Sequence, residues 1–125
     1  MFYGSMTEFA VAFNALVEDH STWSQATFGL DSERGPLGAL KHLEKEAKEA
    51  QEAWSAVTLQ DEMNSERMKA FRAELADCLL LLLDASRRAG VNPMRLVMDA
   101  QAKMQVNKLR VWIKPTSDVP SEHVK

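Results

Sequence analysis

The stretch Glu74-Leu-Ala-Asp-Cys-Leu-Leu-Leu-Leu-Leu-Asp84 combines five consecutive leucines with three carboxylates. Along one face of the expected helix, apolar residues recur at helical spacing, namely Phe71, Leu75, Leu79 and Leu82, and the other leucines extend the apolar surface nearly all round. A helix that is apolar on most sides is usually buried, either in the centre of a helical bundle or at a subunit interface. This stretch therefore predicts an all-α fold.

Further helices on either side complete a predicted bundle. Apolar periodicity and capping residues place the helices at residues 7–19 with an interruption or bend at His20 to Trp23, at 36–56, at 65–89 and at 93–111. Gly29, Gly35 and Pro36 mark a loop that either links the first two helices or closes over a ligand. We expect one domain over residues 1–112, built of four to five helices, and an irregular tail over 113–125.

Length, charge and cysteine content argue against several classes of protein. A chain of 125 residues suits a single core. The formal net charge of -3 argues against binding to nucleic acid, and the longest apolar run, Cys78 to Leu83, is far shorter than the roughly 20 residues that cross a bilayer. The single cysteine cannot form an intrachain disulfide and fits a reducing compartment. We therefore expect a cytoplasmic protein without nucleic-acid or membrane partners.

A second stretch, residues 42–52, repeats the pattern of carboxylates three residues apart beside an apolar stripe. Glu46 and Glu49 share one face of its helix, and Glu74 and Asp77 share one face of the leucine-rich helix. Two such pairs facing each other would bind a hard divalent cation, because Mg²⁺ and Mn²⁺ prefer oxygen ligands. Asp77 supports this hypothesis, since aspartate is a poor helix former and the leucine-rich helix would be more stable without it.

Simpler interpretations of these acids stay open. Helix surfaces are rich in Glu and Lys, so a single Glu-x-x-Glu pair is most often an ordinary surface feature. Asp77 or Asp84 can form a structural ion pair with Arg72 or Arg88, because a buried charge needs a partner. In a metal-free alternative, the protein is a helical interaction protein whose carboxylates pair with Arg72, Arg87 and Arg88 across a dimer interface.

Polar residues elsewhere suggest contacts to a substrate. Lys103, Asn107 and Arg110 fall on one stripe of the last predicted helix, an arrangement that suits phosphate groups. His42 is expected to contact the substrate or to orient a carboxylate, since Mg²⁺ favours oxygen over nitrogen, although a solvated helix histidine fits the pattern equally well. His20 has no informative neighbours in the sequence.

Together these motifs resemble the MazG-like all-α nucleoside triphosphate pyrophosphohydrolases, and within them the dATP/dGTP pyrophosphohydrolase branch. That family carries EExxE on one helix and ExxD on the next. The second motif is complete as Glu74-Leu-Ala-Asp77, whereas in the first, Lys45-Glu46-Ala-Lys-Glu49, a lysine replaces the leading glutamate. The segment from Trp23 to Gly29 and the closing pattern Lys103-x-x-x-Asn107-Lys108-x-Arg110-x-Trp112 are also similar, and the likeness covers residues 20 to 112.

The resemblance implies an enzyme that depends on Mg²⁺ or Mn²⁺ and hydrolyses dGTP or dATP to the monophosphate and pyrophosphate. Two to three ions would be held by the ligands Glu46, Glu49, Glu74 and Asp77, and the proton acceptor would be Glu49 or Glu46. The implied substrate-binding residues are Trp23 and Phe28 at the base, His42 nearby, and Lys103, Asn107, Lys108 and Arg110 at the phosphates.

The resemblance also implies a homodimer or homotetramer with active sites near the subunit interface, working in the cytoplasm of a bacterial host or encoded by a phage. Lys45 removes one possible ligand or base from the family scheme. An alternative within the same class is a house-cleaning pyrophosphatase for pyrimidine or damaged nucleotides, because base preference depends on the shape of a pocket.

Overall fold

The computed structural model describes residues 4–125. These residues form four helices, α1 (Met6–Phe28), α2 (Leu37–Ser55), α3 (Glu66–Arg88) and α4 (Pro93–Leu109). Within this range the only β-pairing is an isolated antiparallel bridge between Trp112 and His123. The predicted all-α fold is confirmed. No helix of the described part is long and apolar enough to cross a membrane.

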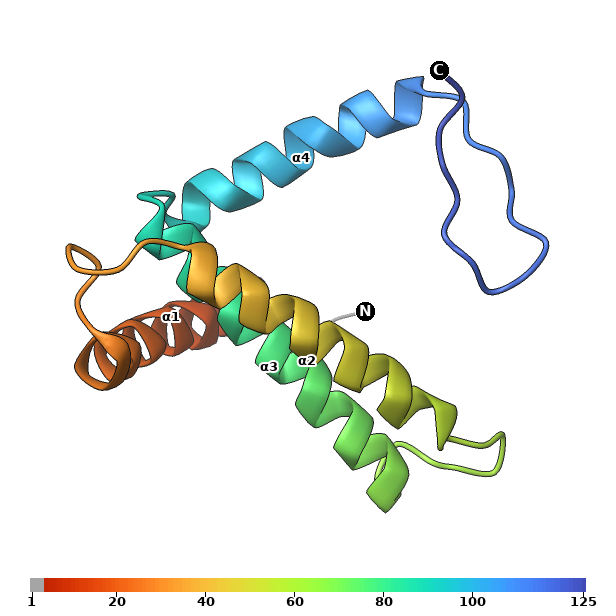
Figure 1. The fold of residues 1–125 in the computed structure, drawn as a ribbon, viewed down its shortest axis with the longest axis horizontal. Helices are drawn as coiled ribbons and strands as arrows, with labels where there is room; N and C mark the ends of the chain where they lie inside the picture. Colours follow the sequence, from red (N-terminus) through yellow and green to blue (C-terminus); the bar gives the residue numbers. More distant parts are fainter. Residues whose placement is uncertain (1–3) are drawn as a thin grey trace. The chain divides into compact units, whose positions relative to one another are not determined.

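The chain forms two compact units, Met1–Pro93 and Met94–Lys125, and each is described by itself. In the first unit α2 and α3 lie side by side and run in opposite directions, and α1 contacts α3 (Figure 1). In the second unit the indole Nε1 of Trp112 donates to the Asn107 carbonyl oxygen at 2.8 Å. This hydrogen bond joins the segment after α4 to the last turn of the helix. The expected division of the chain at residue 112 stays a prediction.

The first helix differs from its prediction at both ends. It begins after Ser5 rather than at Thr7, because Ser5 and Glu8 form a capping box in which each side chain accepts a hydrogen bond from the other's backbone amide. It then continues without interruption through His20 to Phe28. His20 and Ser24 are one helical turn apart and are both buried, so His20, the first residue of the predicted break, lies inside the fold.

Hydrogen bonds and backbone conformation explain both ends of α3 and the connection between α2 and α3. The hydroxyl of Ser65 accepts a hydrogen bond from the Met68 amide at 3.1 Å and so caps α3, close to the predicted helix start at residue 65. In the preceding connection Asp61 accepts a hydrogen bond from the Thr58 amide at 2.7 Å and forms an ion pair with Arg67 at 3.0 Å. Gly90 follows α3 with a φ of 82°, a conformation that favours glycine.

Among the described residues, the interior of the helical unit contains more buried polar than buried apolar side chains. The buried apolar residues of the described chain are Ala39, Ala50, Leu83 and Ala85, and the buried polar ones are His20, Ser24, Glu46, Asp84 and Arg88. The leucines that were expected to be buried on α3 are partly exposed in a single chain, at 48% for Leu75, 43% for Leu79 and 42% for Leu82.

Candidate metal centre and adjoining cavity

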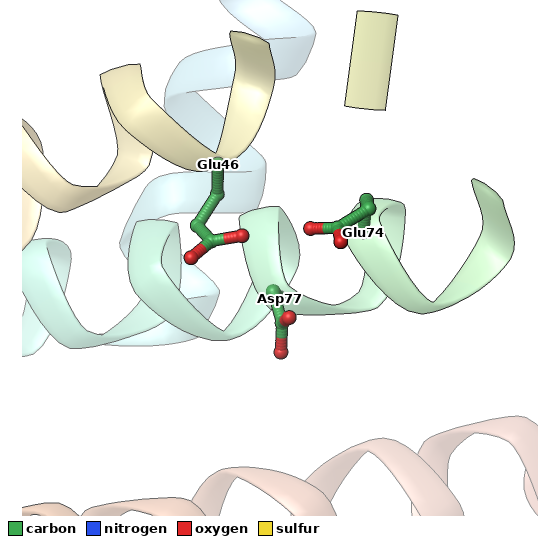
Figure 2. A group of neighbouring side chains, drawn as sticks. All are labelled: Glu46, Glu74 and Asp77. Atoms are coloured by element: carbon green, nitrogen blue, oxygen red, sulfur yellow. The ribbon is translucent and has the colours of Figure 1, made fainter. Parts of the chain in front are cut away.

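Three carboxylates from two helices meet where α2 passes α3. Glu46 is on α2, and Glu74 and Asp77 are on α3. One oxygen of each lies within 4.8 Å of the others. Figure 2 shows Glu46 reaching from α2 toward α3, Glu74 turned toward it, and Asp77 extending from α3 beside them. The i, i+3 spacing places the two acids of α3 on one face, and the antiparallel packing brings Glu46 opposite them.

Glu46 and Glu74 strongly affect each other's protonation. A hydrogen bond with Glu46 raises the pKa of Glu74 to about 7, and burial and the nearby charges of Glu46, Glu49 and Asp77 act in the same direction. The same hydrogen bond lowers the pKa of Glu46, assisted by Glu49 and His42. Without a cation, the pair therefore retains a proton that an isolated glutamate would lose well below neutral pH.

Glu49 lies beside this group and is not part of it. Its carboxyl group hydrogen-bonds with Glu46, and that contact, followed by burial, raises the pKa of Glu49. It is not among the carboxylates that come within 4.8 Å of one another. The structure thus brings together three of the four predicted ligands and places the fourth next to Glu46.

The donor set fits a hard divalent cation. All three groups offer oxygen, which Mg²⁺ and Mn²⁺ prefer, and Glu46 is buried rather than solvated. The Oε2 atom of Glu74 is buried and has no hydrogen-bond partner, which is costly unless a ligand completes the site. His42 Nε2 lies 3.0 Å from Glu46 Oε1, so this histidine contacts a carboxylate from outside the group.

A cavity of about 180 Å³ adjoins the acids. Trp23 and Phe28 from the end of α1 form one wall, with their ring centroids 5.3 Å apart in an edge-to-face arrangement. Glu46 and Asp77 line the cavity, and so do His20, His42, Leu80, Leu81 and Asp84. A larger cavity of about 560 Å³ touches His20 and Arg87 but none of the three clustered acids, so we place the site at the smaller one.

Residues 16–125 match the family described as dATP/dGTP pyrophosphohydrolase. The chain belongs to this family. Comparisons with curated proteins and with solved structures find no match. Membership confirms the predicted resemblance and makes the protein an enzyme of the nucleoside triphosphate hydrolase class, which argues against the alternative of a non-enzymatic interaction protein.

Asp84 and Arg88 of this family member form the structural ion pair that was one alternative from sequence. Arg88 Nε lies 3.2 Å from Asp84 Oδ2, and the Ser24 hydroxyl donates to Asp84 Oδ1 at 2.7 Å. Burial opposes ionisation of Asp84, but these bonds and a further one from Arg87 lower its pKa. Arg87 also pairs with Asp31 at 3.0 Å. The two arginines therefore neutralise acids other than those of the metal cluster.

His20 is a residue of the site that sequence reasoning missed. The prediction that it has no informative neighbours is wrong, because it is buried, lines the cavity beside the acids and lies with its ring centroid 6.1 Å from that of Trp23. Its Nδ1 atom has no hydrogen-bond partner, and burial lowers the pKa of the imidazole. Its spacing of four residues from Ser24 is the signal that could have placed both on one inner face.

The predicted phosphate-binding residues lie in the second compact unit. Lys103, Asn107 and Lys108 are on α4, and Arg110 follows its end. The backbone carbonyl oxygen of Asn107 accepts hydrogen bonds from the Arg110 amide and the Trp112 indole, while its side-chain Oδ1 is buried without a hydrogen-bond partner. The role of these four residues in binding the phosphates of a nucleotide stays a prediction.

Proposed function

We propose that the protein hydrolyses a purine deoxynucleoside triphosphate, dGTP or dATP, to the monophosphate and pyrophosphate in the presence of Mg²⁺ or Mn²⁺. The observation that carries this proposal is the group of three carboxylates within 4.8 Å, directly beside a cavity walled by two aromatic rings. Family membership supports the substrate class. An aromatic wall next to oxygen ligands suits a ligand that has a flat base at one end and phosphates at the other.

Glu46, Glu74 and Asp77, with Glu49 beside them, would hold two to three ions. When bound, the ions neutralise the triphosphate and lower the pKa of an attacking water. His42 orients Glu46 through the contact of 3.0 Å. Glu49 stands outside the three-carboxylate group and its pKa is raised, so we assign it as the acceptor of the water's proton, with Glu46 as the second choice.

Trp23 and Phe28 would enclose the base, because they form the apolar wall of the cavity next to the acids. Lys103, Asn107, Lys108 and Arg110 would bind the phosphates and compensate the charge that develops on the leaving pyrophosphate. The spacing of these polar residues along one stripe of the helix supports the second assignment.

We propose further that the active form is a homodimer or homotetramer. Leu75, Leu79 and Leu82 leave more than two fifths of their surface exposed along α3, whereas few apolar side chains of the described chain are buried. A helix this apolar is more stable against a second copy of itself than in water.

The test is incubation with dGTP, dATP, dUTP and dCTP in separate reactions containing Mn²⁺, with product analysis by ion-exchange chromatography. We expect monophosphate and pyrophosphate in equal amounts from dGTP or dATP. Preferential cleavage of dUTP or dCTP would instead favour the pyrimidine alternative. Recovery of all four triphosphates intact would rule out the proposed reaction.

A further inference from the structure

The attachment of α1 to α3 depends on polar contacts. The buried side chains of α1 are His20 and Ser24, so no buried apolar side chain of this helix secures it. Hydrogen bonds are directional, whereas apolar burial is not. The orientation of α1 is therefore set by where those polar groups find their partners.

Ser24, Asp84 and Arg88 form a closed triangle of hydrogen bonds, which we call the Ser24 clasp. The Ser24 hydroxyl donates to Asp84 Oδ1 at 2.7 Å and accepts from Arg88 Nη2 at 3.1 Å, and Arg88 Nε donates to Asp84 Oδ2 at 3.2 Å. Ser24 is 0% exposed, and the two charged partners are also buried. A buried ion pair is stable only when its remaining polar groups are satisfied, and Ser24 contributes to this beside Arg87, which also donates to Asp84 Oδ1.

Arg88 also holds the chain that leaves α1. The last turn of α1 contains no basic residue, yet the carbonyl groups at a helix C-terminus need donors. Arg88 Nη1 donates to the Gly29 carbonyl oxygen at 3.0 Å, and Arg34 donates to that of Phe28 at 3.2 Å. Arg88 on α3 thus fixes both Ser24 and the residue that follows the helix.

The clasp lies next to the proposed nucleoside cavity. Asp84 lines this cavity on α3, seven residues after Asp77, which places them on the same face two turns apart. On α1 the clasp residue Ser24 directly follows Trp23 and precedes Phe28 by one turn. Any displacement of Ser24 therefore moves the aromatic wall relative to the acids.

We propose that Ser24, Asp84 and Arg88 are positioning residues that hold the Trp23–Phe28 wall at the correct distance from the acid cluster, and so determine the KM for the nucleotide. This inference rests on the proposed function. The clasp residues neither bind metal nor touch the reacting phosphates; they act through the wall. Loss of the clasp should accordingly weaken binding of the nucleoside while leaving the metal ligands in place.

The first test is Ser24→Ala, which removes one hydroxyl and adds no volume. With whichever of dGTP or dATP the wild-type protein cleaves faster, at saturating Mn²⁺, we expect KM to rise roughly tenfold, since a small misplacement by a remote substitution can cost up to about a hundredfold. We expect kcat to change by no more than about twofold, because only binding shared by ground state and transition state is lost. Half-saturation by Mn²⁺ should be unchanged.

The matched control is Ser21→Ala, which removes a hydroxyl from the same helix. Ser21 accepts a hydrogen bond from Gln25 within α1 at 3.0 Å, outside the clasp, and it does not line the nucleoside cavity. Its KM should equal that of the wild-type protein. Equal KM values for Ser24→Ala and Ser21→Ala, in folded proteins, would overturn the positioning role.

Arg88→Lys provides a second variant that retains the charge. A lysine can pair with Asp84, but a single ammonium group lacks the planar fork that reaches Asp84, Ser24 and the Gly29 carbonyl together. We expect the same rise in KM with unchanged Mn²⁺ half-saturation. A parallel loss of kcat and of Mn²⁺ affinity would show a general structural defect and overturn the proposal. Absence of nucleotide hydrolysis in the wild-type protein would instead overturn the proposed function and this inference with it.

Discussion

At Glu74 the demands of folding and of metal binding oppose each other. Its Oε2 atom is buried without a partner, and its contact with Glu46 raises its pKa to about 7. A bound cation would reverse that preference by stabilising the ionised form. We infer that the residue is retained for binding, because a helix of this composition would be more stable with an uncharged side chain there.

The raised pKa of Glu74 should make the free energy of unfolding depend on pH. The pKa of Glu74 is raised from 4.5 to about 7, so the folded protein binds more protons than the unfolded chain between these values. Stability therefore falls as pH rises from about 4.5 to 7 in the absence of metal. Glu74→Gln should remove this fall and make the metal-free protein more stable than wild type above pH 7, as measured by urea unfolding in EDTA. Equal pH profiles for the two proteins would argue against the shared proton.

A substitution of Asp77 distinguishes a metal ligand from a residue of a structural ion pair. Asp77→Asn keeps the size of the side chain and removes its charge, so we expect turnover to fall by at least about a hundredfold while the protein stays folded. If the site binds Mn²⁺ in the folded state, we expect Mn²⁺ to raise the melting temperature of the wild-type protein, and this rise should shrink in the variant. Glu52→Gln, on an exposed position of α2, is the control and should keep both. Full activity of Asp77→Asn would remove Asp77 from the site.

At the scale of helices, the ends of α3 were predicted more accurately than the course of α1. The predicted range 65–89 agrees closely with α3 (Glu66–Arg88), because the cap at Ser65 and the positive φ at Gly90 depend on neighbouring residues alone. The predicted interruption of α1 near His20 was wrong. His20 is buried, and one turn later Ser24 donates a hydrogen bond to Asp84 of α3; a pattern of polarity within one helix does not reveal such a partner.

The cap of α3 offers a test at this scale. Ser65→Ala removes the hydrogen bond to the Met68 amide and should destabilise the protein by about 1 kcal/mol. The free energy of unfolding from urea titration gives this value directly. Ser32→Ala, at an exposed position between α1 and α2, is the control and should change it by less than about 0.5 kcal/mol. Similar losses in the two variants would show that the cap contributes little.

For the whole molecule, the exposed leucines of α3 predict assembly. Leu79→Glu places a charge on the apolar face, and we expect it to shift the protein from dimer or tetramer to monomer in sedimentation velocity experiments. Leu59→Glu, at a fully exposed position in the connection between α2 and α3, is the matched control and should leave assembly unchanged. A wild-type protein that sediments as a monomer contradicts the proposed oligomer.

The sequence by itself determined the helical class, most helix ends and the acids that share a face, since helical periodicity assigns angles to residues without reference to partners. It did not determine which faces meet. Only the tertiary structure placed Glu46 opposite Glu74, buried His20 beside the cavity, and joined Ser24 to an ion pair 60 residues away. These contacts depend on how the helices cross, which many distant side chains decide together.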